Sequence, residues 1–263
     1  MISILVVVPT LNSCHLLPRL VRSLEEQSFT RWRVLFVDGK SDQCHKNWLR
    51  DQCAKDARFQ WEEESPNVKG IFSAMNQGFR HAREDEWILF WGSDDIAADK
   101  DVFQKVENGL KSIGSRADLY ICSARYYSMG DLLRDGYTIK KDRISRFEPS
   151  RTFRESLFWG STPPHQATLV GPGARRLLNS YNEEFRITAD LDYFLRLSQL
   201  GQIQVFVDTL VLVLMGNAGV SARECKRRTI EVIRSYRKSF GYLWIFPFVL
   251  RYTRRAWSIL KQL

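Results

Sequence analysis

Residues 87–95 constrain the fold of this chain most strongly, because an apolar run there leads directly into two adjacent carboxylates. Trp87–Trp91 is followed by a Gly-Ser pair and then by Asp94 and Asp95. The pattern predicts a buried strand that ends in a polar loop, which is where open α/β sheets bind ligands. Carboxylate oxygens suit hard cations such as Mg²⁺ or Mn²⁺, which take further ligands from water and phosphates. The pair therefore indicates a divalent-metal site at a strand end.

The same two aspartates have a simpler explanation as helix caps. A helical pattern over Ile96–Leu110 follows them directly, and Asp is a favoured N-cap residue. This segment alone does not distinguish a cap from a metal site.

The composition argues against a disordered or disulfide-stabilised chain. Of the 263 residues, 44% are hydrophobic, which is ample for the core of one large or two small α/β domains. The five cysteines are scattered and form no CxxC pair, as is typical of reduced cytosolic thiols. Cys44, His45 and Cys53 could form part of a zinc site, but a fourth ligand at a suitable spacing is missing.

The apolar runs near the two ends are short. Ile2–Val8 has no basic segment before it and is interrupted by Pro9, so we expect a buried strand and not a signal peptide, with the mature chain starting at or near Met1. Tyr242–Leu250 has nine residues, contains Pro247, and is too short to cross a bilayer as a helix.

The net charge is concentrated in one segment. Residues 223–263 contain eleven Lys or Arg and two Glu, a net of +9 that equals the net charge of the whole chain. Aromatic residues lie among these charges, a composition typical of a segment in an anionic membrane interface; they include Tyr242, Trp244, Phe246, Phe248, Tyr252 and Trp257. Nucleic acid would also satisfy the charge, but no recognised nucleic-acid motif accompanies it. A solvated helix face beside an aromatic core cluster is the alternative.

Strand and helix patterns alternate along the chain. The expected strands are Ile4–Val8, Val34–Val37, Phe59–Trp61, Trp87–Trp91, Leu119–Tyr126 and Gln204–Leu214. The expected helices are Leu16–Gln27, Ile71–His81, Asp101–Lys111, Gly171–Asn179 and Leu191–Leu200. Asp51–Arg58 is interpreted as a short polar connection, and Asp131–Pro149 as a hairpin or loop.

These patterns predict an α/β fold with a mostly parallel central sheet flanked by helices. The β-branched content of the first two strands indicates burial on both faces, as in a parallel sheet. The one composition shift is the basic segment. We therefore expect one domain over residues 1–222 and a basic aromatic helical appendage over residues 223–263.

Polar residues follow three of the expected strands. Pro9, Thr10 and Asn12 follow the first, Asp38 ends the second, and Asp94 with Asp95 follows the strand Trp87–Trp91. Each loop alone is weak evidence, because polar turn residues follow most strands. Together they place small and acidic groups around one nucleotide-sized region at the carboxyl edge of the sheet.

At this point the chain resembles the family 2 glycosyltransferases, and in particular the branch that builds bacterial surface polysaccharides. Five motifs carry the resemblance in the family's order over roughly residues 2–220: Val8–Asn12, Val37–Asp42, Lys69–Gly78, Phe90–Asp95 and Ala189–Leu197. The resemblance implies the nucleotide-sugar-binding GT-A fold, with residues 1–222 as the catalytic domain.

The resemblance also implies roles for individual residues. Asp94 would match the last carboxylate of the family's DXD motif, with Asp95 beside it at the Mn²⁺ or Mg²⁺ ion, and Asp190 would match the general base. The nucleotide-sugar site would comprise Pro9, Thr10, Asn12, Asp38, Lys69, Gly70, Asn76, Ser93 and Asp94. Gly92 stands where many members have the first Asp of the motif, Ala189 replaces a usual Glu, and Ser73 replaces a common Asp.

Other residues are candidates for contacts with the sugar or the acceptor. His165 and Gln166 follow a Ser-Thr-Pro-Pro turn, and Ser221 lies in a small-residue stretch that is similar to the loop over the diphosphate in this family. His165 could equally be a structural histidine. Asp190 has an alternative as the N-cap of Leu191–Leu200, and Asp192 is a nearby residue of the same type.

We therefore predict an inverting, metal-dependent glycosyltransferase. It would move a sugar from a nucleotide-diphosphate donor to a hydroxyl of a glycan or lipid-linked acceptor, in the cytoplasm at the inner face of the membrane. A nucleotidyltransferase that makes nucleotide sugars is an alternative, although Pro9–His15 lacks the glycine and basic residues of its triphosphate loop. A non-catalytic membrane-surface adaptor on a degenerate transferase domain is another.

Overall fold

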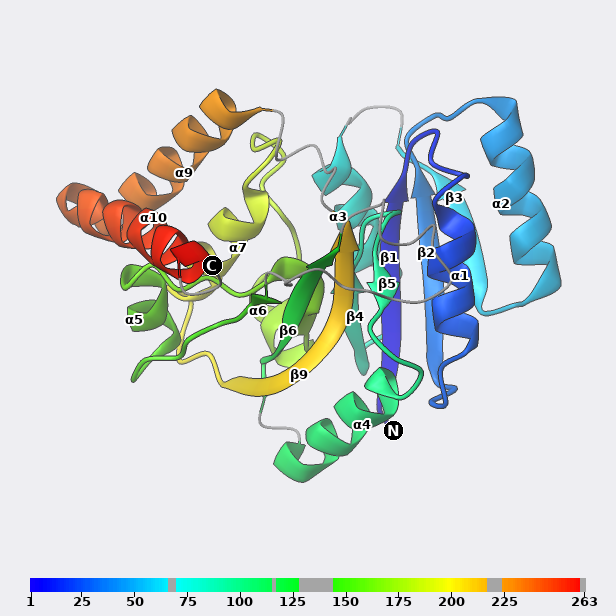
Figure 1. The fold of residues 1–263 in the computed structure, drawn as a ribbon, viewed down its shortest axis with the longest axis horizontal. Coiled ribbons are helices and arrows are strands. Elements are labelled where there is room, and N and C mark those ends of the chain that lie inside the picture. The colour runs from blue at the N-terminus through cyan, green and yellow to red at the C-terminus, as the bar shows by residue number, and fades with distance from the viewer. Residues whose placement is uncertain (66–69, 115–116, 128–143, 217–223, 261–263) are drawn as a thin grey trace.

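A mixed sheet with helices on both faces forms the body of the molecule (Figure 1). The computed structural model describes residues 1–65, 70–114, 117–127, 144–216 and 224–260, with side chains up to Arg254. Its strands are β1 (Ser3–Thr10), β2 (Trp32–Asp38), β3 (Phe59–Glu63), β4 (Glu86–Phe90), β5 (Ile96–Ala97), β6 (Leu119–Tyr127), β7 (Ile144–Ser145), β8 (Thr168–Val170) and β9 (Val205–Gly216). They lie in the order β3-β2-β1-β4-β8-β6-β9-β5, with β7 beside β6.

Most of these strands run in one direction. β1 pairs in parallel with β2 and β4, and β2 with β3. The short β8 is antiparallel to both β4 and β6, so β6 and its parallel partner β9 share the direction of β4. β5 and β7 are antiparallel to β9 and β6. The predicted mostly parallel sheet is therefore confirmed.

Helices cover both faces of the sheet. They are α1 (Leu17–Glu25), α2 (Gln43–Lys55), α3 (Ile71–His81), α4 (Val102–Ile113), α5 (Phe153–Phe158), α6 (Pro172–Leu177), α7 (Ala189–Leu197), α9 (Cys225–Phe240) and α10 (Ile245–Leu260), with 3-10 turns η3 (His165–Ala167) and η4 (Gly241–Trp244). α3 has the predicted bounds, and the predicted helices over α1, α4, α6 and α7 are present with shifted ends.

Two predictions about local structure were wrong. Ile96 does not begin a helix, because Ile96 and Ala97 form β5 and pair with Leu214 and Val213 of β9. Asp94 and Asp95 are therefore not caps of a helix over residues 96–110. α2 was not predicted from the sequence, because its buried side is small and includes two polar residues, His45 and Gln52.

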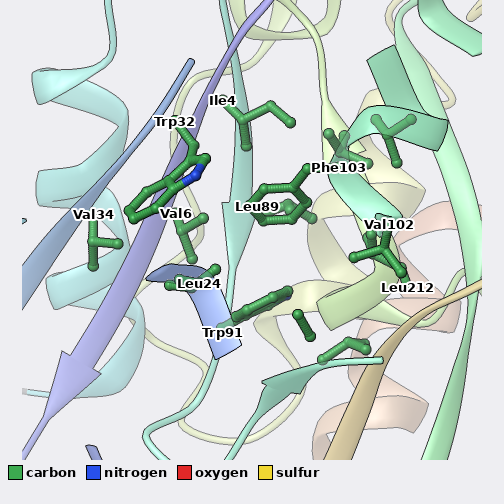
Figure 2. Packing of buried hydrophobic residues seen from close by; sticks show 14 of the residues in the cluster. Ile4, Val6, Leu24, Trp32, Val34, Leu89, Trp91, Val102, Phe103 and Leu212 are labelled. Carbon is green, nitrogen blue, oxygen red and sulfur yellow. The ribbon is translucent and has the colours of Figure 1, made fainter. Parts of the chain in front are cut away.

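The core lies in two layers, one on each face of the sheet. In β1, Ile4, Val6 and Val8 pack into one layer, which α1, α2 and α4 cover, and Figure 2 shows part of it. Leu5 and Val7 pack into the other, with α3, α5, α6, α7 and α9. This alternation confirms burial of β1 on both faces, and it leaves the strand ends as the open edge.

The C-terminal helices pack on the domain. Val232 and Tyr236 of α9 are buried in the same core layer as Leu191 and Leu195 of α7. At the end of α5, a side chain on Gly160 would meet the backbone of Arg251 in α10, so the two segments touch. Within the described residues, no helix is both long and apolar enough to span a membrane.

Candidate active site

The loops after β1 and β2 meet because the two strands are parallel neighbours, with Thr10 opposite Asp38. Asp38 is fully buried, and its carboxylate accepts hydrogen bonds from the Thr10 hydroxyl (3.3 Å), from the Ser41 backbone N–H (3.0 Å) and from the Ser41 hydroxyl. Asp38 thus connects the loop after β1 with the loop after β2 through buried hydrogen bonds.

Asn12 completes the connection between these loops. Its backbone N–H donates to Ser41 Oγ, its Oδ1 accepts from the Asp42 backbone N–H, and both distances are 2.8 Å. Asn12 and Lys40 have φ angles of 48° and 67°, in the left-handed region that Asn tolerates better than most residues. The side chains fix two irregular turns, so the loops form one preorganised rim.

His45 supports this rim from the first turn of α2. Its ring is fully buried, with Nε2 3.4 Å from Asp38 Oδ1. Burial lowers the pKa of His45, and the nearby Asp38 and Asp42 carboxylates offset only part of this effect. The imidazole is therefore neutral at pH 7.

The loop after β4 joins the rim through Ser93. The Ser93 hydroxyl donates to the Pro9 carbonyl (3.2 Å) and accepts from the Ser13 hydroxyl (2.9 Å). β1 and β4 are parallel neighbours with Val7 opposite Phe90. The carboxyl ends of β2, β1 and β4 thus form a continuous edge.

Asp94 and Asp95 occupy different environments in this loop. Asp95 is buried, and its Oδ2 accepts the Gly92 backbone N–H at 2.6 Å, which closes a tight turn. Burial raises the pKa of Asp95 well above its usual value, and the neighbouring Asp94 charge adds to this. Asp94 is half-buried, and in the described part of the chain no hydrogen bond or ion pair engages its carboxylate.

Two glycines surround the Asp94 carboxylate. A Cβ on Gly216, at the end of β9, would lie 2.2 Å from Asp94 Oδ2, and a Cβ on Gly92 would lie 2.9 Å from Oδ1. Both contacts are shorter than van der Waals separation, so a side chain at either position would move this carboxylate. The glycine at position 92, where the family resemblance expects Asp, therefore fits the close approach of Asp94.

The chemistry of the donor set fits a hard divalent cation bound together with a diphosphate. Asp94 offers carboxylate oxygens at the strand edge, and the buried Asp95 carboxyl group lies beside it. The described residues contain no group of three or more His, Cys, Asp or Glu side chains that could hold a metal ion by itself. Such an ion would therefore need most of its ligands from water and phosphate oxygens, as Mg²⁺ commonly does.

Asp190 lies in the first turn of α7, near His165 and Tyr181, whose rings contact Phe90 at the end of β4. Thr188 is the N-cap residue, so Asp190 is inside the helix and its alternative as N-cap was wrong. The His165 ring stacks on Phe90, the last residue of β4, at 5.6 Å, and His165 Nε2 lies 2.8 Å from the Tyr181 hydroxyl. Asp190 interacts electrostatically with both His165 and Tyr181.

The charge state of this group follows from burial. Burial lowers the pKa of His165, with a partial opposing effect of Asp190, so the imidazole is neutral at pH 7. In the described chain, no side chain forms a hydrogen bond or an ion pair with the half-buried Asp190 carboxylate. Asp192, by contrast, is buried and holds the Arg196 Nε at 2.7 Å. This ion pair gives Arg196 a structural role within α7.

Three expected site residues are engaged by the protein itself. The buried Asn76 amide exchanges hydrogen bonds with the backbone of Tyr181 and donates to Glu183. The Gln166 carbonyl accepts from the Trp91 indole at 2.9 Å. The Gly70 N–H donates to Glu64 at 2.8 Å. Lys69 and Ser221 lie outside the described residues.

Three residues of this region, His45, Glu64 and Tyr181, were not predicted to belong to the site. Glu64 follows β3, is buried, and has a pKa that burial raises. His45 had a weak local signal, since it lies three residues after the N-cap Asp42. Tyr181 had none, because its position beside His165 results from packing between distant segments.

Comparisons with known proteins agree with this geometry. The sequence profile described as Glycosyl transferase family 2 matches residues 5–168, more than half of the chain. A relative named PGL/p-HBAD biosynthesis glycosyltransferase, from Mycobacterium tuberculosis (strain ATCC 25177 / H37Ra), is 24% identical over 191 residues, which cover 73% of this chain and 68% of that protein.

Solved structures share the fold. TarS 1-349 from S. aureus aligns with a TM-score of 0.65 and 15% identity over 96% of this chain and 71% of its own, and TarS has also been solved with UDP-GlcNAc. The mannosyltransferase PcManGT from Pyrobaculum calidifontis, solved with GDP-Man and Mn²⁺, aligns with a TM-score of 0.64 and 14% identity, over 99% of this chain and 72% of its own. The GT-A fold expected from the sequence is confirmed, and the chain belongs to glycosyl transferase family 2 and is a glycosyltransferase.

Proposed function

We propose that this glycosyltransferase inverts the anomeric carbon of a sugar, which it moves from a nucleotide-diphosphate donor to a hydroxyl of a glycan or lipid-linked acceptor in surface polysaccharide synthesis. The observation that carries the proposal is the contrast between Asp190 and Asp192. Asp192 is paired with Arg196, whereas no side chain of the described residues pairs with the Asp190 carboxylate, which lies near the end of β4 that also bears Asp94. The family match decides against the nucleotidyltransferase alternative.

The donor would lie along the edge formed by β2, β1 and β4. The TarS and PcManGT structures hold UDP-GlcNAc and GDP-Man, which are both nucleoside-diphosphate sugars. In this chain the rim built by Asp38, Asn12 and Ser93 is held by internal hydrogen bonds, so little ordering would be needed on binding. Pro9, Thr10 and the segment around Gly70 would complete the nucleoside side.

A divalent ion, Mn²⁺ or Mg²⁺, would be held by Asp94, with Asp95 beside it. When bound, the ion would supply Lewis-acid stabilisation of the charge that develops on the leaving diphosphate. The turn closed by Asp95 and Gly92 sets the direction of the Asp94 backbone, and the Tyr127 hydroxyl donates to the Asp94 carbonyl. These contacts would fix the position of the Asp94 carboxylate before the donor arrives.

Asp190 would act as the general base. As the acceptor oxygen forms its bond to C1, its proton passes to Asp190, and the C1–O bond to the diphosphate breaks with its electron pair on the nucleotide. One displacement from the opposite face inverts C1. A charged histidine beside Asp190 would lower its basicity, and the neutral state of His165 avoids this. His165, Gln166 and Ser221 would contact the sugar or the acceptor.

The acceptor would be presented at an anionic membrane surface, at the inner face of the cell membrane. The positive charge of residues 223–263 supports this part of the proposal.

A donor screen tests the proposed function. UDP-, GDP- and dTDP-sugars are compared for their effect on the melting temperature, with Mn²⁺ and with EDTA, because a ligand of the native state raises apparent stability. We expect one nucleotide class to stabilise the protein only with the metal, and the anomeric configuration of the product, read by NMR, to be opposite to that of the donor. Retention would disprove inversion, and no response to any donor would favour the non-catalytic adaptor.

A further inference from the structure

The C-terminal segment after α9 has two different sides. Trp244 and Phe248 are half-buried and pack against the core layer that contains α7. Between and after them, large apolar side chains are exposed to solvent, namely Tyr242, Leu243, Ile245, Phe246 and Val249. Among the aromatic residues of the basic segment, Trp244 and Phe248 therefore pack against the domain, whereas Tyr242 and Phe246 are exposed to solvent.

Trp159 directly follows α5, in a segment that contacts α9 and α10. The Phe158 ring contacts the Phe240 ring at 5.2 Å, and Gly160 touches the backbone of Arg251. Trp159 lies between these two contacts and is 45% exposed. These exposed side chains make up the η4 face: Trp159, Tyr242, Leu243, Ile245, Phe246 and Val249.

The C-terminal segment contributes only positive charge around the η4 face, and the one carboxylate bonded to a side chain of the face is Glu155, whose Oε1 lies 3.3 Å from Trp159 Nε1 in the described residues. After Glu231 the chain contains seven Lys or Arg and no Asp or Glu. Arg234 and Arg254 are paired with Glu184 and Glu148 of the domain. Arg237 and Lys238 are exposed in the last turn of α9, directly before η4. Exposed cations thus adjoin an exposed apolar and aromatic surface.

We propose that the η4 face is the surface by which this protein inserts into an anionic lipid bilayer. The inference deepens the membrane part of the proposed function by naming the residues that contact lipid and those that do not. Trp and Tyr are favoured at the membrane interface, and cations next to it are attracted to anionic headgroups. α9 and α10 lie at the end of the molecule opposite α2 (Figure 1).

A second copy of the chain fits this face less well. A twofold dimer would bring the η4 face of one copy against that of the other, and Arg237 and Lys238 would then approach their own counterparts. Because residues 232–263 contain no acidic side chain, the segment itself offers no partner for these charges. A bilayer with anionic lipid supplies the opposite charge and an apolar phase together.

α9 does not lie in the membrane in this arrangement. Its apolar side is buried on α7, and its Glu231 is buried against the chain before α7. The membrane contact is thus restricted to the turn between α9 and α10, the first turns of α10, and Trp159.

Vesicle flotation tests the proposal with the full chain. The variant Leu243→Ser/Phe246→Ser is compared with the control Leu177→Ser/Leu200→Ser, which removes two similarly exposed leucines elsewhere. On phosphatidylcholine vesicles that contain phosphatidylglycerol, we expect the affinity of the first variant to fall by about tenfold or more. The control should bind like the unmodified protein. Arg237→Gln/Lys238→Gln should weaken binding mainly at low salt.

Melting temperature and donor binding by calorimetry are measured on the same samples. The melting temperature and the donor affinity should both be unchanged in the variants of the η4 face. This separates the inference from the proposed function, because an unmodified protein that binds no donor but binds vesicles would contradict the function and not the membrane contact. Flotation of the Leu243→Ser/Phe246→Ser variant at the unmodified level, or no flotation of the unmodified protein, overturns the proposal. A dimer that this variant abolishes, without lipid binding, would assign the face to self-association instead.

Discussion

Asp192 Oδ2 lies 2.7 Å from Arg196 Nε, one turn further along α7, and this ion pair separates the roles of two aspartates that are two residues apart. Asp190 has no such partner in the described chain. We expect Asp190→Asn to bind donor normally but to lose transfer by about 10²- to 10⁴-fold in kcat, because a missing base affects the transition state more than the bound ground state.

Asp192→Asn is the matched control for this prediction. It should lower the melting temperature, since Arg196 loses its partner, and should reduce kcat much less. An inactive Asp192→Asn beside an active Asp190→Asn would show that the base has been assigned to the wrong residue.

Asp94→Asn should weaken Mn²⁺-dependent donor binding by about tenfold or more, because a neutral amide replaces a hard carboxylate ligand. Calorimetry with donor, in Mn²⁺ and in EDTA, measures the effect. The melting temperature without ligand should change little, because no described side chain binds this carboxylate. Equal donor affinity in the variant and the unmodified protein would exclude Asp94 as a metal ligand.

Gly216→Ala should reproduce part of the Asp94→Asn effect although it removes no polar group. The added Cβ would lie 2.2 Å from Asp94 Oδ2, and the end of an Asp side chain can rotate away, so the carboxylate moves while the fold survives. Gly92→Ala, with a separation of 2.9 Å, should have the smaller effect. Donor affinity in Mn²⁺ is the measurement, and a reversed order of the two variants would contradict the geometry.

The sequence predicted the parts of the fold that depend on local pattern. The apolar runs of β1 and β2 and the spacing of Ile71–His81 gave their elements because burial on both faces, or on one helical face, leaves a clear periodicity. β5 was missed because a two-residue strand has no period, and its pairing with Leu214 is a long-range contact. α2 was missed because His45 and Gln52 lie on its buried side.

The candidate site could be predicted only at the residues that short motifs mark. Asp38, Asp94 and Asp190 follow from motifs. The distinction between the partly open Asp94 and the buried Asp95 does not, because it arises from a turn that the Gly92 N–H closes onto Asp95. The neighbourhood of His165 and Tyr181 likewise depends on how the chain after α6 packs against β4.

His45→Gln should flatten the loss of stability on acidification. The pKa of His45 is lowered in the folded protein, so between the usual value near 6.5 and the folded value the unfolded chain binds the extra proton. This group therefore reduces the free energy of unfolding as the pH falls below about 6.5. The raised pKa of Asp95 acts in the opposite direction, so the difference between variant and unmodified protein is the informative quantity. Denaturant titrations at pH 7.5, 6.5 and 5.5 measure it, and parallel curves would show that His45 does not titrate in this range.

Glu231→Gln should lower both the stability of the fold and the catalytic rate, because Glu231 in α9 holds the chain directly before α7, the helix that carries the proposed base. Glu231 is buried, and its two carboxylate oxygens accept the backbone N–H groups of Arg186 (3.0 Å), Ile187 (2.9 Å) and Thr188 (3.0 Å), directly before α7. An amide at this position supplies one acceptor oxygen and turns an NH₂ group toward buried donors, at a cost of about 1 to 3 kcal/mol in the free energy of unfolding. The negative charge at the N-terminus of α7 is lost as well.

The same substitution should lower kcat, since the first turn of α7 positions Asp190, while donor affinity should remain, because the rim formed by β1, β2 and β4 is untouched. Glu224→Gln is the control, as Glu224 is exposed and lies 3.8 Å from Arg227 on the surface of α9. Thermal denaturation and steady-state kinetics at saturating donor measure both effects. A Glu231→Gln variant as stable and as active as Glu224→Gln would show that Glu231 does not fix the start of α7.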